Sequence, residues 1–451
     1  MMQKKHWWGL IGLFFIGIAV ILGIGFYHYT NTNSHSKTLP TTNQTPKIWV
    51  LSDTHFIADS LHDNGHKFKY MEATAASKDL KYGTVLLKSL VQKALKERPA
   101  AVIITGDVTF NGAKKSATQL AKIFKPLTDN QINFLVIPGN HDIYDGWARS
   151  FKGKHEYKTE QISPEDWHHI FKSSYENATS VDPASLSYTV QLNDQYQLLL
   201  LDTNKYSVGP ATTAPYTSGT IRPATIKWLE QQLKEGQKKG LRTISFTHHN
   251  LYQHSSRGKF GYVIENTATV QRLFSKYDVK LNFAGHIHAQ DITKDSTGRC
   301  PTIEVLNGSY AVAPNSYGEL KLTPGKLDYQ KKMMDISPFL RSQEQINTDL
   351  SHHKAYAKKL FFDDTKAIIY ERLYAQAKNQ PKLLDAAAQS FAQLNWYFFT
   401  GTDNLSAQQV EEFEQTTGFK ALVKYGAVSA NYAQTALQDN NMDDNSLTIE
   451  Y

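Results

Sequence analysis

The sequence has almost no cysteine: Cys300 is the only one among 451 residues. One cysteine cannot form an intramolecular disulfide, and it cannot supply a thiolate cluster for a metal. Any metal bound by this chain must therefore be held by histidine, aspartate, glutamate or asparagine. Cys300 lies between Arg299 and Pro301, away from any His-Asp pattern, and we interpret it as a structural residue.

The sequence also lacks a dense cluster of basic residues. Lys and Arg total 49 against 42 Asp and Glu, a formal net charge of +7. This mild excess is more typical of general solubility than of a nucleic-acid surface, and it would also suit a protein near an anionic membrane or cell wall. A nuclease would need a continuous basic groove, so nucleic acid is not an expected partner. Hydrophobic residues make up 41% and charged residues 20%, as in ordinary globular proteins.

Charge is missing altogether from Trp7 to Tyr27. At about 1.5 Å per residue this run can span a bilayer core of roughly 30 Å. Lys4 and Lys5 precede it, and the next basic residue is Lys37, which predicts a cytoplasmic N-terminus. We therefore predict a single-pass membrane anchor (1–29), a flexible polar linker (30–46) and an extracytoplasmic remainder. The alternative is a cleaved signal peptide and a secreted protein.

From residue 47 to 334, short β-branched runs alternate with amphipathic helices, which predicts an α/β domain with mixed sheets. Asn193-Asp194 favours a hairpin, and Ser163-Pro164 is typical of a helix start. The predicted strands are Lys47–Leu51, Ala101–Thr105, Phe134–Ile137, Tyr188–Leu192, Gln197–Leu201, Thr243–Thr247, Leu281–Ala284 and Thr302–Leu306. The predicted helices are Val85–Glu97, Ala117–Asp129, Glu165–Asn177, Pro223–Lys238 and Asn266–Tyr277.

After about residue 335 the strand pattern stops, and we predict a C-terminal all-helical domain (335–451). One apolar stripe has helical spacing: Leu384, Ala388, Phe391, Leu394 and Phe398. A second helix is expected to begin at Ser406, with Gln409 completing a capping box. The acidic, polar tail from Asp439 is expected to fray.

Five short polar motifs each follow an apolar run of the α/β part: Asp53-Thr54-His55, Gly106-Asp107, Gly139-Asn140-His141-Asp142, Thr247-His248-His249 and Gly285-His286-Ile287-His288. Loops at the carboxyl ends of strands converge on one crevice in open α/β sheets. Taken singly, each motif also fits ordinary turn chemistry. Together they predict one site.

Asp, His and Asn without Cys form a ligand set for Mn, Fe, Zn or Co. Pairs spaced by two, such as Asp53/His55 and His286/His288, would point the same way if the local backbone were extended. The glycines before Asp107, Asn140 and His286 would allow tight turns. So many ligands indicate two ions, roughly 3.5–4 Å apart, which would lower the pKa of a bridging water to give a hydroxide nucleophile.

The series D-x-H, GD, GNHD, H and GHxH resembles the signature of calcineurin-like metallophosphoesterases, over about residues 47 to 320. The resemblance implies a four-layer sandwich of two mixed β-sheets flanked by helices. Within that family, the Gly106–Gly112 segment (GDVTFNG) and the C-terminal helices are most similar to class III cyclic-nucleotide phosphodiesterase-like bacterial surface proteins.

The resemblance also implies roles for individual residues. One metal is held by Asp53, His55 and His288. The other is held by Asn140, His248 and His286. Asp107 bridges both ions. His141 lies beside the scissile phosphate, where it stabilises charge or protonates the leaving oxygen.

One position departs from the family pattern. Many members have an Asp three residues after the bridging Asp, where it orients the catalytic His; this chain has Phe110 there, followed by Asn111. Asn111 is our candidate to take over that role. Asn111 and His249 are also candidate substrate contacts.

The expected activity is a metal-dependent phosphodiesterase acting on a small phosphodiester such as a cyclic nucleotide. A phosphomonoesterase, a nucleotide-sugar pyrophosphatase or an envelope-polymer phosphoesterase would use the same metals, and an exported site favours scavenging or envelope chemistry. The alternative of another class is a non-catalytic surface scaffold. The sequence does not decide the oligomeric state.

Overall fold

The computed structural model describes residues 45–255, 260–343, 346–426, 431–432, 434, 436–437 and 442–451. The predicted anchor (1–29) and nearly all of the linker (30–46) lie outside these residues and stay predictions. Within the described residues, no helix is both long and apolar enough to cross a membrane.

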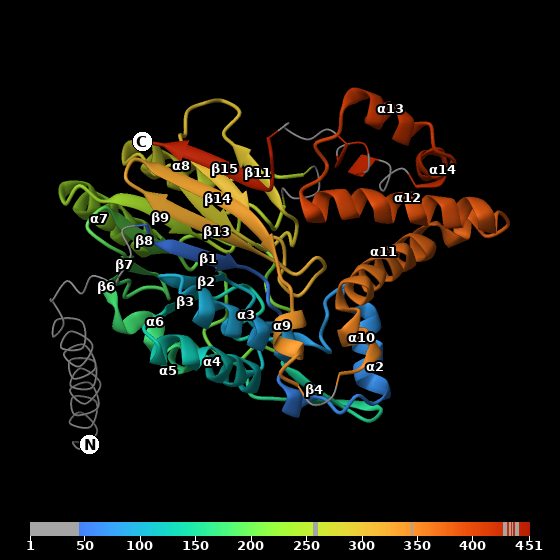
Figure 1. Ribbon diagram of the computed structural model, residues 1–451, viewed down its shortest axis with the longest axis horizontal. Helices are drawn as coiled ribbons and strands as arrows, with labels where there is room; N and C mark the ends of the chain where they lie inside the picture. The colour runs from blue at the N-terminus through green and yellow to red at the C-terminus, as the bar shows by residue number, and fades with distance from the viewer. Residues whose placement is uncertain are drawn as a thin grey trace, which may run out of the picture.

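Two β-sheets lie face to face at the centre of the molecule (Figure 1). The first has the order β15-β14-β13-β1-β2-β3, in which β1, β2 and β3 are parallel and the others are antiparallel to their neighbours. Its strands are β1 (Lys47–Leu51), β2 (Ala101–Thr105), β3 (Asn133–Ile137), β13 (Ser316–Thr323), β14 (Lys326–Met333) and β15 (Ser446–Glu450).

The second sheet has the order β11-β12-β10-β9-β8-β7-β6, with β8, β9, β10 and β12 parallel. Its strands are β6 (Ala178–Val181), β7 (Tyr188–Gln191), β8 (Tyr196–Leu200), β9 (Arg242–Phe246), β10 (Leu281–Ala284), β11 (Asp291–Lys294) and β12 (Ile303–Leu306). A separate hairpin joins β4 (Arg149–Lys152) to β5 (His155–Lys158).

Helices cover the outer face of each sheet, because the central strands are apolar on both sides. In β1, Ile48 and Val50 enter the core between the sheets, while Trp49 and Leu51 pack against the helices outside. On the second sheet, Leu199 faces α7 and α8. The helices of this part are η1 (Asp59–Leu61), α2 (His66–Thr74), α3 (Gly83–Glu97), α4 (Lys114–Asp129), α5 (Pro164–Ile170), α6 (Lys172–Glu176), α7 (Pro223–Lys238) and α8 (Thr267–Lys276). The predicted layers of helix, sheet, sheet and helix are confirmed.

Local sequence signals explain several helix ends. The Ser163 side chain accepts from the Asp166 N–H at the start of α5, with Pro164 as the first helical residue. The single helix predicted over Glu165–Asn177 is divided at Phe171 into α5 and α6. In the C-terminal part, the predicted capping box of Ser406 and Gln409 is present.

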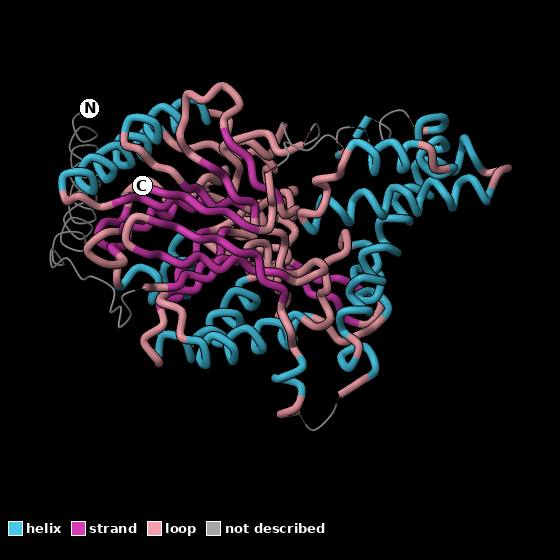
Figure 2. The backbone as a smooth tube through the Cα atoms, turned by 45° about the horizontal axis from the view of Figure 1, so that its top comes forward, coloured by secondary structure: helices cyan, strands magenta, loops and turns pink. Residues whose placement is uncertain are grey.

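The C-terminal helices form an arm at one end of the sandwich, and α11 and α12 extend away from the sheets in both ribbon views (Figures 1 and 2). The elements are α9 (Ser337–Leu340), α10 (Thr348–Ser351), α11 (His353–Ala377), α12 (Pro381–Thr400), α13 (Ala407–Glu414) and α14 (Thr417–Tyr425). These C-terminal helices have a hydrophobic core of their own, which includes Ile369, Ala388 and Leu422.

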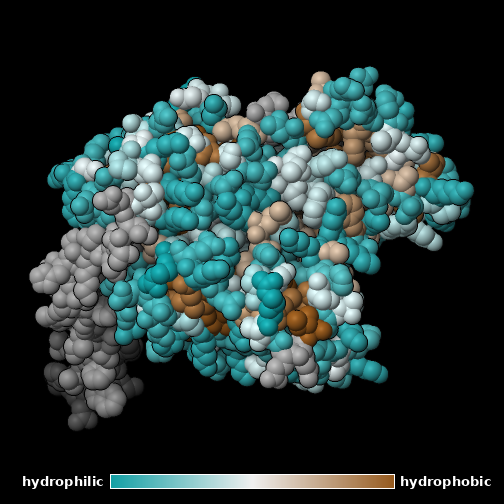
Figure 3. Space-filling model, in the orientation of Figure 1, coloured by the Kyte–Doolittle hydropathy of each residue, from teal (hydrophilic) through white to brown (hydrophobic). Residues whose placement is uncertain are grey.

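The last segment corrects our expectation of an all-helical C-terminal domain with a frayed tail. Residues Ser446–Glu450 form β15, which pairs antiparallel with β14 from Lys326↔Glu450 to Gln330↔Ser446. Ile449 is buried in the core between the sheets. The chain therefore returns to the first sheet after the helical arm. The surface in Figure 3 is mostly hydrophilic, with small, separated apolar patches, as expected when the core is enclosed.

Candidate metal centre

The five predicted motifs meet at one edge of the sandwich. Asp53 follows β1, Asp107 follows β2 and Asn140 follows β3, and these strands are neighbours in the first sheet. His248 follows β9 and His286 follows β10, which are neighbours in the second. The carboxyl ends of five buried strands therefore converge on the same space, as predicted.

The backbone conformations at this edge are unusual, and they correct our expectation that the ligand pairs lie on extended backbone. Asp53 (φ 51°), His55 (39°), Asp107 (45°), His286 (71°) and His288 (69°) all have left-handed backbone conformations. The pairs spaced by two therefore converge through tight left-handed turns, not through extended backbone. Such conformations cost about 1–3 kcal/mol each in residues with side chains, and they cluster at functional sites.

Two glycines permit close approach of the loops. A Cβ on Gly139 would lie 2.1 Å from the Asp107 nitrogen, and one on Gly285 would lie 1.8 Å from Ser52 Oγ. No side chain fits at either position. These two glycines are therefore needed for contact between the loops, and of the three predicted turn glycines it is Gly106 that has a left-handed backbone (φ 99°).

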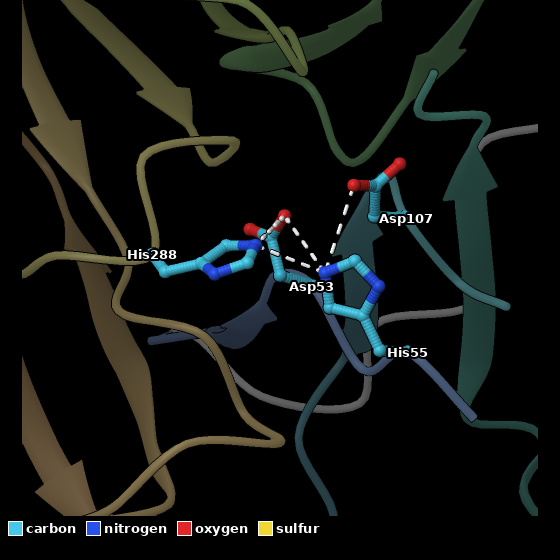
Figure 4. Close-up of side chains that lie close together, drawn as sticks. All are labelled: Asp53, His55, Asp107 and His288. Atoms are coloured by element: carbon cyan, nitrogen blue, oxygen red, sulfur yellow. Dashed lines mark hydrogen bonds and ion pairs between the residues drawn. The ribbon is translucent and has the colours of Figure 1, made fainter. Parts of the chain in front are cut away.

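The first cluster contains Asp53, His55, Asp107 and His288, whose ligand atoms all lie within 4.8 Å of one another. Figure 4 shows the side chains converging, with His288, Asp53 and Asp107 all approaching the same ring nitrogen of His55. His55 Nε2 is 2.9 Å from His288 Nε2 and 3.6 Å from Asp107 Oδ2. Asp53 Oδ1 is 3.4 Å from His288 Nε2.

The second cluster contains Asp107, His248 and His286, with Asn140 beside them. His248 Nε2 lies 3.5 Å from Asp107 Oδ1 and 3.2 Å from Asn140 Oδ1. Asp107 thus offers Oδ2 to the first cluster and Oδ1 to the second.

The donor set fits divalent cations. His248 Nδ1 donates to the Thr105 carbonyl (2.9 Å), so Nε2 carries a lone pair that faces the lone pairs of Asn140 Oδ1. His286 Nε2 donates to the Gly261 carbonyl (3.0 Å), which leaves its Nδ1 free to bind. A cation between these atoms would satisfy both sets of lone pairs, and backbone carbonyls that fix the tautomer are typical of metal-binding histidines.

Burial favours the neutral form of three histidines of the centre. Burial lowers the pKa of His286 to about 4 and also lowers the pKa values of His55 and His288. Neutral imidazole is the form that binds a metal ion. The geometry, the tautomers and the charge state therefore agree on two adjacent cation sites that share Asp107.

His141 lies at the rim of the centre, with 25% of its side chain exposed. Its backbone N–H donates to Asp107 Oδ1 (2.8 Å), and its Nδ1 lies 3.1 Å from Asp145 Oδ2. Burial opposes protonation of His141, but the Asp107 and Asp145 carboxylates raise its pKa above the ordinary value. The missing Asp partner is therefore supplied from four residues further along the chain.

Asn111 does not orient His141, and His249 has no ring nitrogen free to contact substrate. Asn111, our candidate to orient His141, donates instead to the Arg149 carbonyl (3.3 Å). His249 is fully buried, with Nδ1 bonded to Thr203 Oγ1 (2.8 Å) and Nε2 to the Thr217 carbonyl (3.0 Å). Both polar ends of the His249 ring are occupied within the protein, so we assign it to support of the loop after β9.

A cation that we did not predict also faces the centre. The backbone of Lys78 bridges to Val312, in a segment that hydrogen-bonds to the main chain of Asp53. Lys78 Nζ donates to the Ala75 carbonyl (3.2 Å) and forms no ion pair within the described part of the chain. Burial lowers its pKa, while the nearby Asp107 and Asp53 carboxylates act in the opposite direction.

The C-terminal arm holds the loop that carries Lys78. The Ser77 N–H donates to Asp364 Oδ2 on α11 (2.6 Å), and His353 Nε2 lies 2.9 Å from Asp79 Oδ2. Ser77 has a left-handed backbone (φ 65°), so the loop needs such external support. No local sequence pattern marks these contacts, because their partners are more than 270 residues apart.

The loop after His248 is anchored by buried Glu304. Its carboxylate accepts from the N–H groups of Leu251 (2.8 Å) and Tyr252 (3.0 Å). His254 pairs with Glu304 through Nε2 (2.9 Å) and with Asp291 through Nδ1. This buried triad fixes the path of the loop that follows His248.

The triad predicts a pH-dependent stability. Burial opposes protonation of His254, but Asp291 and Glu304 raise its pKa from 6.5 to about 9. A raised pKa stabilises the fold fully below pH 6.5, and this contribution is lost as the pH rises through about 9, by up to about 3 kcal/mol. Urea unfolding between pH 6.5 and 9 should show a fall in unfolding free energy that is absent in His254→Gln. Equal pH dependence in both proteins would contradict this assignment.

Two family profiles match the chain. Residues 46–290 match the family described as calcineurin-like phosphoesterase. Residues 335–443 match the C-terminal domain of cyclic nucleotide phosphodiesterase. No curated protein sequence matches the chain.

Several solved structures resemble this one. A dimetal phosphatase from Danio rerio is 13% identical and covers 64% of this chain and 96% of its own, with a TM-score of 0.47. A purple acid phosphatase from yellow lupin is 13% identical, with a TM-score of 0.42; the match covers 66% of this chain and 52% of the lupin chain. A putative 5′-nucleotidase from Staphylococcus aureus is 17% identical, with a TM-score of 0.37; the match covers 75% of this chain and 66% of the Staphylococcus aureus chain. With TM-scores below 0.5, these likenesses add nothing to the family match.

Proposed function

Because the chain belongs to the calcineurin-like phosphoesterase family and is a metal-dependent phosphoric ester hydrolase, we propose that it hydrolyses a small phosphodiester such as a cyclic nucleotide. The observation that carries this proposal is the pair of clusters joined by Asp107, with His141 held at their rim by Asp145. The match of residues 335–443 supports the choice of a cyclic nucleotide.

The residues of the two clusters bind and orient the reacting groups. Asp53, His55 and His288 would hold one cation, and Asn140, His248 and His286 the other, with Asp107 shared between them. When bound, two divalent cations supply a water of lowered pKa and neutralise the charge of the phosphate.

His141 and Asp145 would act on the leaving group. Asp145 accepts from Nδ1, which leaves Nε2 of the imidazole free to face the substrate. A proton held at Nε2 can pass to the leaving oxygen as the P–O bond breaks, and the Asp145 carboxylate stabilises the imidazolium before transfer.

Lys78 would bind a phosphate oxygen that the cations do not reach. A charge-assisted hydrogen bond contributes about 1.5–3 kcal/mol, so Lys78→Met should raise KM by about 10-fold or more and change kcat less. The matched control is Lys81→Met, because Lys81 pairs with Asp349 on the surface (3.0 Å) and should leave KM unchanged. An unchanged KM in Lys78→Met would remove Lys78 from the substrate site.

The test of the proposed function is hydrolysis by the full chain with Mn, Fe, Zn or Co. Bis-p-nitrophenyl phosphate and p-nitrophenyl phosphate differ in having two ester bonds or one. Preferential turnover of the diester that stops on chelation and resumes with metal supports the proposal. Preference for the monoester makes the protein a phosphatase, and no turnover with any metal favours a binding scaffold.

A further inference from the structure

An exposed indole ring lies beside the catalytic histidine. Trp147 has 52% of its surface exposed, whereas Trp49 and Trp167 are fully buried. Its ring is nearly parallel to that of His141, with centroids 6.2 Å apart and planes inclined by 28°. The indole therefore lies beside the imidazole and offset from it at the rim of the metal centre, and about half of its surface is open to solvent.

The backbone that carries Trp147 is firmly held. The Trp147 N–H donates to Asp145 Oδ1 (2.7 Å), the same carboxylate that binds His141. Arg149 Nη1 donates to the carbonyls of Gly146 and Ala148, each at 2.9 Å. A Cβ on Gly146 would lie 2.2 Å from the Thr213 carbonyl oxygen, so the turn is also wedged against another loop. The ring is exposed although its attachment is fixed, which distinguishes it from a mobile surface side chain.

We propose that Trp147 is a stacking surface for the base of a nucleoside phosphodiester, on the side of the substrate next to the leaving oxygen. The ring is large and planar and is carried by a backbone fixed beside His141, and aromatic rings in such positions serve as stacking surfaces for bases. Stacking of a base on an aromatic side chain contributes about 1–3 kcal/mol and tolerates different bases. Asp145 then has two roles, because one oxygen lies against His141 and the other accepts from the backbone N–H that carries the indole.

This inference rests on the proposed phosphodiesterase function and narrows its substrate to nucleoside esters. The competing explanation is that Trp147 only shields His141 and fixes its ring. Shielding would affect every substrate equally, whereas stacking depends on the base. The two explanations therefore differ in the ratio of rates for substrates with and without a base.

The experiment compares two cyclic phosphodiesters with the same leaving oxygen. One is adenosine 3′,5′-cyclic phosphate, and the other is the corresponding cyclic ribose phosphate with hydrogen in place of the base. Wild-type full chain, Trp147→Ala and Trp147→Phe are assayed for kcat/KM on both. We expect the wild-type ratio to favour the nucleotide, to fall about 10-fold in Trp147→Ala and to be largely restored in Trp147→Phe.

Other outcomes separate this inference from the proposed function. An equal loss on both substrates in Trp147→Ala, or a wild-type ratio near one, overturns the stacking role. Turnover of bis-p-nitrophenyl phosphate without turnover of either cyclic ester also overturns it, although the phosphodiesterase proposal stands. Failure on all three diesters, with metal present, rejects the proposed function itself.

Discussion

Replacing Asp107 with asparagine is expected to reduce kcat/KM by at least about 10³-fold and to abolish the binding of two metal ions together. Asp107 extends Oδ2 toward His55 and Oδ1 toward His248, at 3.6 and 3.5 Å. Asparagine has one acceptor oxygen, and its amide NH₂ cannot bind a cation. Loss of a residue that only supports a ligand typically costs 10–100-fold, so the loss of a shared ligand should cost more.

Metal content and activity should be measured on the same preparations. We expect the wild-type chain to retain two ions after gel filtration and Asp107→Asn to retain at most one. The matched control is Asp129→Asn, because Asp129 is an exposed carboxylate that pairs with Lys125 at the end of α4. Two tightly bound ions and a normal rate in Asp107→Asn would contradict the shared-ligand arrangement.

Sequence alone could predict the central strands and the place of the metal centre. The runs Ile48–Leu51 and Val102–Ile104 are apolar at consecutive positions, because these strands are buried on both faces. Each run is followed directly by polar residues. The change from apolar to polar residues therefore marks both the end of the strand and the position of the site.

The strands β13, β14 and β15 could not be predicted in this way. β13 and β14 contain charged residues: Lys321 is exposed, Lys331 is half-buried, and buried Glu319 accepts a hydrogen bond from Trp49 Nε1. β15 pairs with residues about 120 positions earlier, and its sequence follows an acidic stretch with no local sign of a strand. Pairing over such distances is decided by packing that a local pattern does not contain.

The carboxylate partner of His141 could not be predicted from the family spacing. The sequence departs from the expected pattern at Phe110, and we looked to the adjacent Asn111 for a replacement. The carboxylate comes instead from Asp145, because the turn after β3 brings it back onto His141 within four residues. His141 and Asp145 lie four residues apart in a non-helical turn, so their spacing in the sequence does not by itself predict the contact.

Asp145→Asn should slow hydrolysis of alkyl diesters by about 100-fold and of p-nitrophenyl diesters by less than about 10-fold. The amide oxygen of the substituted side chain could still accept from the Trp147 N–H, so the turn should persist, but the variant loses the negative charge that stabilises an imidazolium. General acid catalysis contributes about 10²–10⁴-fold, and it matters most when the leaving oxygen is strongly basic. The loss of rate should therefore grow with the pKa of the leaving alcohol.

A series of alkyl and aryl phosphodiesters would measure this slope in the wild-type chain, in Asp145→Asn and in Asn111→Ala. Asn111 contacts the Arg149 carbonyl and not His141, so Asn111→Ala should keep the wild-type slope. A uniform loss in Asp145→Asn across all leaving groups would mean that the carboxylate only shapes the turn. A steeper slope in Asp145→Asn alone would place proton transfer at His141 and its charge support at Asp145.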